Sequence, residues 1–406
     1  NYNESMLESM STGVLTLDDA GKIVTCNHAG LEILQVKAEA LLQHAAAEYF
    51  AGDNAWILDK IAEAAAVRGP VDVVDGELMV AGERLSVNVT TYPLNSVEGK
   101  NLGSMIMLED ITSEKRMKST MSRYMDPNVA DKLLASGADL LGGQSLNATM
   151  LFSDIRGFTT ITERLGAQGT VSLLNEYFTL MVDCLQREGG MLDKFIGDAI
   201  MASFGILGDN GDDEDRAVRC AIAMIKVLHE WNAQRASHEQ LPVNIGIGIN
   251  TDNVVSGNIG SPKRMDFTVI GDGVNLAARL ESACKEYGAQ ILVSETTFKS
   301  LKGTYRAREI DYVVVKGKTQ PVSIYEILDY HDETSFPNIA EALQTFKEGL
   351  AAYRQGKWDK AHLEFAQCLE LNPADKAAQL FMERCEHLKA EPPEGEWRGV
   401  WVMKSK

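Results

Sequence analysis

Two aspartates, each closely following an apolar run and lying near a glycine, constrain this chain most. The first, Asp154, comes after the strand-like run 149–152, and Gly157-Phe158-Thr159 then leads into a helix that we expect to begin near Thr160. A carboxylate at a strand end can hold a divalent metal, and the N–H groups of a helix N-terminus can bind phosphate. The pattern therefore predicts a site for a metal-bound phosphate.

The second aspartate, Asp198, lies between two strand-like segments, 194–196 and 199–202. A two-residue loop with glycine first, here Gly197-Asp198, predicts a type II′ hairpin with Asp198 at its tip. If that hairpin pairs with the strand before Asp154, the two carboxylates meet. Either aspartate alone would be a turn or capping residue, so the prediction depends on both and on a third motif.

The third motif is the segment 264–281, in which a short strand ends in Gly271-Asp272-Gly273 and a helix follows. Asn275 and Arg279 are four residues apart and share one face of that helix. On an isolated helix this pair would be an ordinary solvated face. Beside a metal–carboxylate site, it supplies the hydrogen-bond donor and the positive charge that a phosphoryl transition state requires.

Together these motifs resemble the catalytic domain of class III nucleotidyl cyclases over about 180 residues. The resemblance implies a ferredoxin-like βααβαβ core with extra strands, which works as a dimer with active sites at the interface. Carried over by position, the resemblance assigns metal binding to Asp154, Ile155 and Asp198, and substrate contacts to Gly157, Phe158 and Thr159. It assigns purine selection to Lys194 and Thr268, and transition-state stabilisation to Asn275 and Arg279. The terminal phosphates would be bound by Lys316, with Lys318 as the alternative.

The purine-selecting pair favours ATP. Adenine offers N1 as an acceptor and N6 as a donor, so Lys194 can donate to N1 and Thr268 can accept from N6. Guanine reverses this edge, and guanylate cyclases carry Glu and Cys at the matching positions. A buried polar mismatch costs a large factor in selectivity.

The resemblance also implies two divalent ions per site, Mg²⁺ or Mn²⁺, and in-line attack of the ribose 3′ oxygen to give 3′,5′-cyclic AMP. In a homodimer, one protomer would supply both aspartates. The other would supply the base-selecting pair, the Asn275–Arg279 pair and Lys316. Each site would then be incomplete in a single chain.

Two positions depart from the family pattern. Many members carry a basic residue where Gly246 stands, so one expected phosphate contact is weakened. Many carry glycine where Asp252 stands, which can alter a turn. A separate acidic run, 212–215, could suggest metal binding, but such a run is more typical of the negatively charged first turn of a helix.

The rest of the chain divides into further segments. Residues 4–112 resemble a PAS domain, with strand–turn–strand at 13–24 and further strands at 83–94 and 102–109; its ligand or upstream sensor is unknown. We expect a helical linker at 113–146, interrupted at Asp126-Pro127, and the catalytic domain at 147–330. Residues 336–388 resemble a tetratricopeptide repeat that acts as a structural cap on the protein body or on the dimer mate. The tail is 389–406. The predicted fold class is therefore mixed α/β (α+β).

Composition excludes several partners. The net charge of −19 argues against a nucleic-acid partner and against anionic lipid. The six cysteines lack metal-ligand spacing and indicate reduced thiols in a cytoplasmic protein. The sequence has no apolar run of the roughly 18 residues that a membrane span requires. It begins at Asn1, which leaves open domains or anchors upstream.

Two other functions remain open. A catalytically silent signalling scaffold would use the PAS, linker and repeat segments for assembly, although silent homologues usually lose an aspartate or the arginine. A guanylate cyclase is disfavoured by Lys194 and Thr268.

Overall fold

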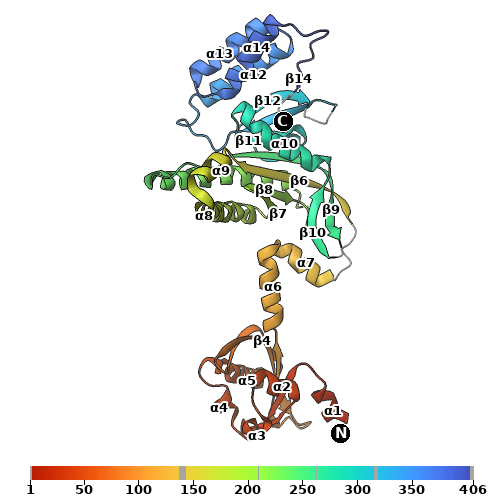
Figure 1. Ribbon diagram of the computed structural model, residues 1–406. Helices are drawn as coiled ribbons and strands as arrows, with labels where there is room; N and C mark the ends of the chain where they lie inside the picture. The colour runs from red at the N-terminus through yellow and green to blue at the C-terminus, as the bar shows by residue number, and fades with distance from the viewer. Residues whose placement is uncertain (1, 137–142, 209, 262, 315–318, 403–406) are drawn as a thin grey trace. The chain divides into compact units, whose positions relative to one another are not determined.

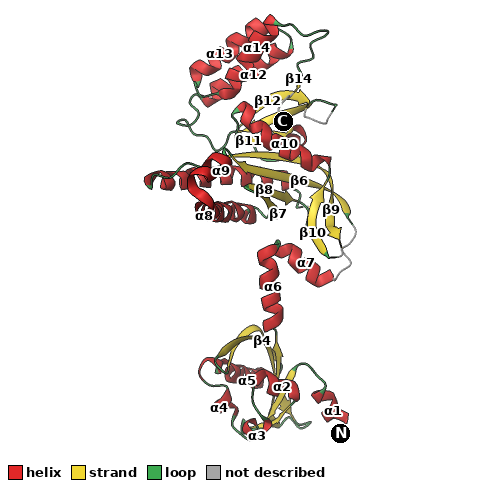
Figure 2. Ribbon diagram, viewed as in Figure 1, coloured by secondary structure: helices red, strands yellow, loops and turns green. Residues whose placement is uncertain are grey.

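The computed structural model describes residues 2–136, 143–208, 210–261, 263–314 and 319–402. It divides into two compact units, Asn1–Tyr124 and Met125–Lys406. Figures 1 and 2 show a β-sheet with surrounding helices in each unit. No described helix is long and apolar enough to cross a membrane.

The first unit contains a five-stranded antiparallel sheet in the order β2-β1-β5-β4-β3. Its strands are β1 (Gly13–Leu17), β2 (Ile23–Cys26), β3 (Val71–Val80), β4 (Glu83–Asn95) and β5 (Asn101–Asp110). Its helices are α1 (Tyr2–Glu8), α2 (His28–Leu34), α3 (Ala38–Leu41), α4 (Ala46–Tyr49), the short 3₁₀ helix η1 (Gly52–Asn54), α5 (Trp56–Val67) and α6 (Thr112–Tyr124). The strand–turn–strand at 13–24 and the two later strands are confirmed, whereas α5 and β3 were not predicted.

Asn27 fixes the start of α2 against β1. Its Oδ1 accepts from the backbone N–H of Gly30, as an N-cap does, and from that of Val14 in β1. Its Nδ2 donates to the carbonyls of Leu7 and Thr12. One buried side chain thus ties helix, strand and N-terminal segment together.

The predicted interruption of the linker is confirmed. Helix α6 ends at Tyr124, and α7 (Pro127–Ser136) begins with proline at its first position. The carboxylate of Asp126 accepts from the N–H of Asn128 at 2.9 Å. Strand β6 (Gln144–Ile155), however, begins inside the range predicted as linker. It starts this early because its whole length pairs with the long strand β9 (Ile245–Ser261).

The second unit contains a nine-stranded sheet in the order β14-β12-β13-β11-β9-β6-β8-β7, with β10 paired to β9. Its strands are β6 (Gln144–Ile155), β7 (Met191–Ile196), β8 (Ala199–Phe204), β9 (Ile245–Ser261), β10 (Arg264–Ile270), β11 (Ile291–Ser294), β12 (Ala307–Val314), β13 (Val322–Ile327) and β14 (Trp401–Val402). Besides α7, its helices are α8 (Phe158–Arg187), α9 (Asp213–Ser237), α10 (Asp272–Tyr287), α11 (Glu295–Ser300), α12 (Ile339–Arg354), α13 (Trp358–Leu371) and α14 (Lys376–Ala390).

Alternate residues of β9 face different helices, as the period of two in a strand requires. Ile247 and Ile249 belong to the core formed with α8 and α9. Between them, Gly248 faces α10: a Cβ at this position would lie 2.2 Å from the backbone nitrogen of Glu281. Only glycine lets the backbone of α10 approach the sheet this closely.

The C-terminal helices pack on the second unit's own sheet. Side chains of α12, α13 and α14 share one hydrophobic core with α10, β11, β12 and β13. A buried arginine reinforces this contact: Arg308 of β12 pairs with Glu326 of β13 and with Asp375, which caps α14, both at 2.7 Å. Strand β14 then returns to pair with β12. The predicted packing of this segment on the body of the protein is confirmed.

Candidate active site

Asp154 and Asp198 meet at one end of β6 and β8. The register pairs Ser153 with Ile200, and a two-residue turn, Gly197-Asp198, joins β7 to β8. Gly197 has φ of +65° and Asp198 does not share a positive φ, as the predicted type II′ hairpin requires. The two carboxyl groups lie within hydrogen-bonding reach. The predicted meeting of the two aspartates is therefore present in the structure.

Burial and the neighbouring acid change the protonation of Asp198. Burial, followed by the hydrogen bond and the negative charge of Asp154, raises the pKa of Asp198 to about 7. The other oxygen contact of Asp154 is local: its Oδ1 accepts from the N–H of Ile155 at 3.0 Å. A buried carboxyl group whose ionisation is opposed by a neighbouring negative charge forms a pocket that a cation would stabilise.

A third acid, Glu281 of α10, belongs to the same cluster and was given no role from the sequence. Burial, and after it the charge of Asp154, raises the pKa of Glu281 to about 7, while Arg156 opposes the shift. The close approach of α10 at Gly248 places Glu281 here. The sequence feature that could have indicated this approach is Gly248, a glycine in the middle of a strand.

Oxygen ligands on adjacent carboxylates suit Mg²⁺ or Mn²⁺. Among the described residues, no group of three or more His, Cys, Asp or Glu side chains is arranged to enclose a metal by itself. The aspartate pair fits an open site, in which phosphate oxygens and water complete the coordination. The donor set therefore fits the metal implied by the sequence.

A helix N-terminus follows the aspartate directly. Helix α8 begins at Phe158, two residues earlier than predicted, with exposed Gly157 at its N-cap. Gly157 has φ of +63°, and nothing lies within 4 Å of the position that its Cβ would occupy. The N–H groups of the first turn, including those of Phe158 and Thr159, have no partner within the helix and are suited to an anion.

The structure also brings Lys194 and Thr268 together, through a residue that the sequence did not single out. The hydroxyl of Thr268 donates to Oδ2 of Asp193 at 2.7 Å. The ammonium group of Lys194 lies 3.6 Å from Oδ1 of the same carboxylate. Asn275 and Arg279 lie one turn apart on α10, with Asn275 exposed and Arg279 half-buried. Lys316 and Lys318 lie outside the described residues.

The two departures from the family pattern have structural counterparts. A Cβ at position 246 would lie 2.7 Å from a guanidinium nitrogen of Arg156 and 2.9 Å from a carboxyl oxygen of Glu281. The space over Gly246 is thus occupied by the basic side chain of Arg156, which directly follows β6, and by Glu281. At the other position, Asp252 accepts from the N–H of Asn253 at 2.8 Å.

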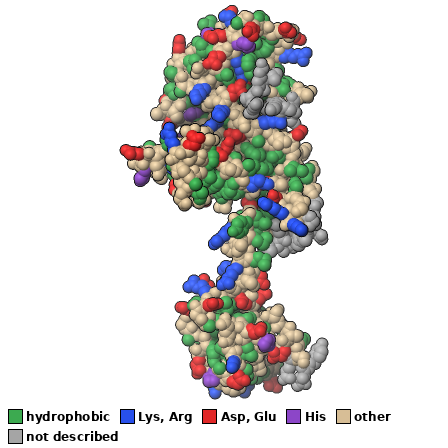
Figure 3. Space-filling model, viewed as in Figure 1, with side chains coloured by type: hydrophobic (Ala, Val, Ile, Leu, Met, Phe, Trp, Pro, Cys, Tyr) green, Lys and Arg blue, Asp and Glu red, His purple; other side chains and the backbone are tan. Residues whose placement is uncertain are grey.

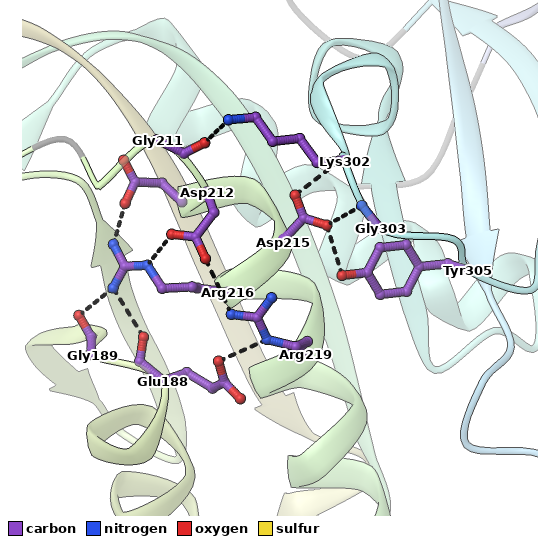
Figure 4. A network of polar contacts seen from close by, with 11 residues as sticks. Glu188, Gly189, Gly211, Asp212, Asp215, Arg216, Arg219, Lys302, Gly303 and Tyr305 are labelled. Carbon is purple, nitrogen blue, oxygen red and sulfur yellow. Dashed lines mark hydrogen bonds and ion pairs between the residues drawn. The ribbon is translucent and has the colours of Figure 1, made fainter.

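The acidic run 212–215 forms the first turn of α9, as predicted, and the carboxylates of its three aspartates are engaged within the protein (Figure 4). Asp215 accepts from the N–H groups of Lys302 and Gly303 and from the hydroxyl of Tyr305. Asp212 pairs with Arg216. These contacts explain the acidic run without a metal.

Comparisons with known proteins agree with this architecture. Residues 143–329 match the family of adenylate and guanylate cyclase catalytic domains. Residues 7–116 match the PAS fold. The chain therefore carries a cyclase catalytic domain and an N-terminal PAS fold, followed by C-terminal helices, and the predicted fold class is confirmed.

Relatives include named adenylate cyclases. One from Anabaena cylindrica is 41% identical over 186 residues, which cover 44% of this chain and 36% of the relative. The terminal-differentiation-specific adenylate cyclase of Dictyostelium discoideum is 33% identical over 277 residues, covering 66% of this chain and 13% of that protein. This chain thus spans well under half the length of either. The crystal structure of the adenylyl cyclase CyaB from P. aeruginosa is 38% identical, covers 47% of this chain and 98% of that one, and superposes with a TM-score of 0.44.

Proposed function

We propose that this protein is an adenylate cyclase that converts ATP to 3′,5′-cyclic AMP and pyrophosphate. The observation that carries the proposal is the contact between Asp154 and Asp198 beside the N-terminus of α8, within a matched cyclase domain. The Lys194–Thr268 pair on one carboxylate favours adenine over guanine. Relatives named as adenylate cyclases support the same choice.

The metal ions and the phosphate oxygens of ATP have separate binding groups in this proposal. Asp154 and Asp198, with Ile155 beside them, would hold two Mg²⁺ or Mn²⁺ ions, which when bound supply Lewis-acid stabilisation of the reacting oxygens. The N–H groups at Gly157, Phe158 and Thr159 receive phosphate oxygens.

The remaining groups bind the base, the ribose and the leaving group. Lys194 donates to adenine N1, and Thr268 accepts from N6. Asn275 orients the ribose, and Arg279 neutralises charge at the α-phosphoryl group. The 3′ oxygen loses its proton to water and bonds to the α-phosphorus, while the bond between that phosphorus and the α,β-bridging oxygen breaks. Pyrophosphate leaves, and we assign its binding to Lys316.

We further propose that each site is shared by two copies of the chain. Among the described residues, no hydrogen bond or ion pair joins the aspartate pair to Asn275 or Arg279. Strands β7, β9 and β10 and the turns beside them expose large apolar side chains, which a second copy can cover: Phe195, Ile196, Val255, Ile259, Met265 and Ile270. A homodimer of this kind brings the two halves of the site together.

The other segments have regulatory or structural roles in this proposal. The PAS fold receives an input from an unknown ligand or an upstream sensor, and α6 and α7 transmit it to the catalytic domain. The helices α12–α14 form a tetratricopeptide-like cap that stabilises the catalytic unit. On the face shown in Figure 3, acidic and basic side chains are interspersed. We therefore propose no nucleic-acid partner. The described cysteines are unpaired, which suits a cytoplasmic protein that uses ATP.

The test is formation of cyclic nucleotide by the purified protein with Mn²⁺ and either ATP or GTP. We expect cyclic AMP from ATP, a much slower reaction with GTP, and none from Asp154→Ala. Glu230→Gln, which neutralises an exposed glutamate on α9, is the matched control. Product from ATP no greater than that of Asp154→Ala would favour a silent scaffold, and preferential use of GTP would favour a guanylate cyclase.

A further inference from the structure

Between the two base-selecting residues lies a buried carboxylate that the proposed reaction does not use. The side chain of Asp193 is fully buried (0% exposed), whereas that of Lys194 is 37% exposed. Oδ2 of Asp193 accepts from the hydroxyl of Thr268 at 2.7 Å and from the backbone N–H of Val269 at 3.3 Å. Oδ1 has no hydrogen-bond partner among the described residues and faces the ammonium group of Lys194 at 3.6 Å.

A β-bulge produces this arrangement. The register of β7 against β8 shifts between Leu192 and Lys194, so that Asp193 is the extra residue. Neighbouring side chains of a regular strand point to opposite faces, but a bulge can re-aim one of them. Asp193 and Lys194 can therefore lie on the same side, and both reach toward β10.

We propose that Asp193 is a positioning residue that makes the site selective for adenine by fixing the direction of the Thr268 hydroxyl. This inference rests on the proposed function. Because the hydroxyl proton is committed to Asp193, the oxygen of Thr268 presents lone pairs to the base. Those lone pairs accept from the exocyclic amino group of adenine. They face the carbonyl oxygen of guanine unfavourably, since neither oxygen has a proton to give.

The same carboxylate also orients Lys194. The attraction between the ammonium group and Oδ1 holds the lysine on the side of β10, where its remaining protons can point to a ring acceptor. Burial raises the pKa of Asp193, whereas the Thr268 hydrogen bond and the charge of Lys194 oppose that shift. Thr268 and Lys194, which contact the base, thus help to keep Asp193 ionised, and Asp193 in turn orients both side chains.

The test measures the ratio of kcat/KM for ATP to that for GTP by direct competition, with Mn²⁺. This ratio does not depend on how much of a preparation is folded, so it remains measurable in a destabilised variant. Asp193→Leu, similar in size but without an acceptor, frees the Thr268 hydroxyl to donate, and we expect the ratio to fall by about tenfold or more. Asp193→Asn keeps an oxygen acceptor and should retain most of the selectivity. Glu230→Gln, an exposed position on α9, should leave the ratio unchanged.

A double-mutant cycle isolates the route through the hydroxyl. Thr268→Val should lower the ratio by itself, and adding Asp193→Leu should then lower it by less than Asp193→Leu does in the unaltered protein, the remainder reflecting the orientation of Lys194. If Asp193→Leu reduces kcat/KM equally for both nucleotides, Asp193 is merely structural and the inference is wrong. A fall in the double variant as large as the one that Asp193→Leu causes in the unaltered protein would also overturn it, because Asp193 would not be acting through Thr268. If the unaltered protein makes no cyclic AMP, the proposed function itself fails, which is a distinguishable result.

Discussion

Neutralising one of the paired aspartates should stabilise the metal-free protein. Asp198 has a pKa of about 7, raised from 3.8 by burial and by Asp154. The folded state therefore holds this proton more tightly than the unfolded chain does. As the pH rises from about 4 to about 7, the unfolded state binds fewer protons than the native state, so this group lowers the free energy of unfolding across that interval.

The magnitude can be worked from the shift. Three pKa units correspond to about 4 kcal/mol at ~1.36 kcal/mol per unit, and partial exposure of Asp198 reduces this to about 2 kcal/mol. Asp198→Asn keeps the shape and removes the charge. In EDTA at pH 8, we expect its unfolding free energy to exceed that of the unaltered protein by about 2 kcal/mol, or roughly 5 °C in Tm. At pH 4.5, less than one unit above the unfolded-state pKa of 3.8, the difference should shrink to about 0.5 kcal/mol.

Thermal and urea unfolding at equal protein concentration measure this difference. Glu163→Gln, which removes an exposed acid from α8, is the matched control and should change little. Mn²⁺ at pH 8 should stabilise the unaltered protein more than Asp198→Asn, because the cation relieves the repulsion. Equal stability of the two proteins in EDTA at pH 8 would refute the claim that burial and Asp154 oppose the ionisation of Asp198.

Three further predictions concern the surrounding structure. Arg308→Met leaves Glu326 and Asp375 buried without their cation and should destabilise the C-terminal helices by about 3–5 kcal/mol; urea unfolding and limited proteolysis report it, and unchanged stability would contradict it. Gly248→Ala places a Cβ 2.2 Å from the backbone nitrogen of Glu281, so α10 must shift and kcat should fall at least about tenfold; a normal kcat would show that the close approach is unnecessary. A two-residue insertion in α6 rotates the C-terminal part of that helix by about 200°, whereas a seven-residue insertion restores the rotation to within about 20°. The two-residue insertion should change the rate of cyclic AMP formation more than the seven-residue insertion, at similar Tm. Equal rates would argue against transmission through this helix.

Local patterns were sufficient to predict the aspartate pair. The glycine-first turn at 197–198 and the apolar run before Asp154 each specify a short element, and pairing of those elements brings the carboxylates together. The i and i+4 spacing of Asn275 and Arg279 likewise survives in the structure because it is a property of one helix.

Residues placed by tertiary contacts could not be predicted in the same way. Asp193 depends on a bulge that only the pairing of β7 with β8 reveals. Glu281 joins the acidic cluster because Gly248 admits α10 to the sheet, a contact between segments far apart in the chain. The return of β14 to β12 had no local signal beyond two tryptophans in a polar tail.

The central claim is that two copies of the chain contribute to each active site, and mixing two inactive variants tests it most directly. Asp154→Ala removes one half of the site and Arg279→Ala the other, so each variant alone should form almost no cyclic AMP from ATP with Mn²⁺. Mixed dimers contain one site in which both residues are intact. We expect activity to return on mixing, approaching about a quarter of that of the unaltered protein when equal amounts exchange randomly between dimers. No recovery, with subunit exchange confirmed by differently tagged chains, would contradict the shared site.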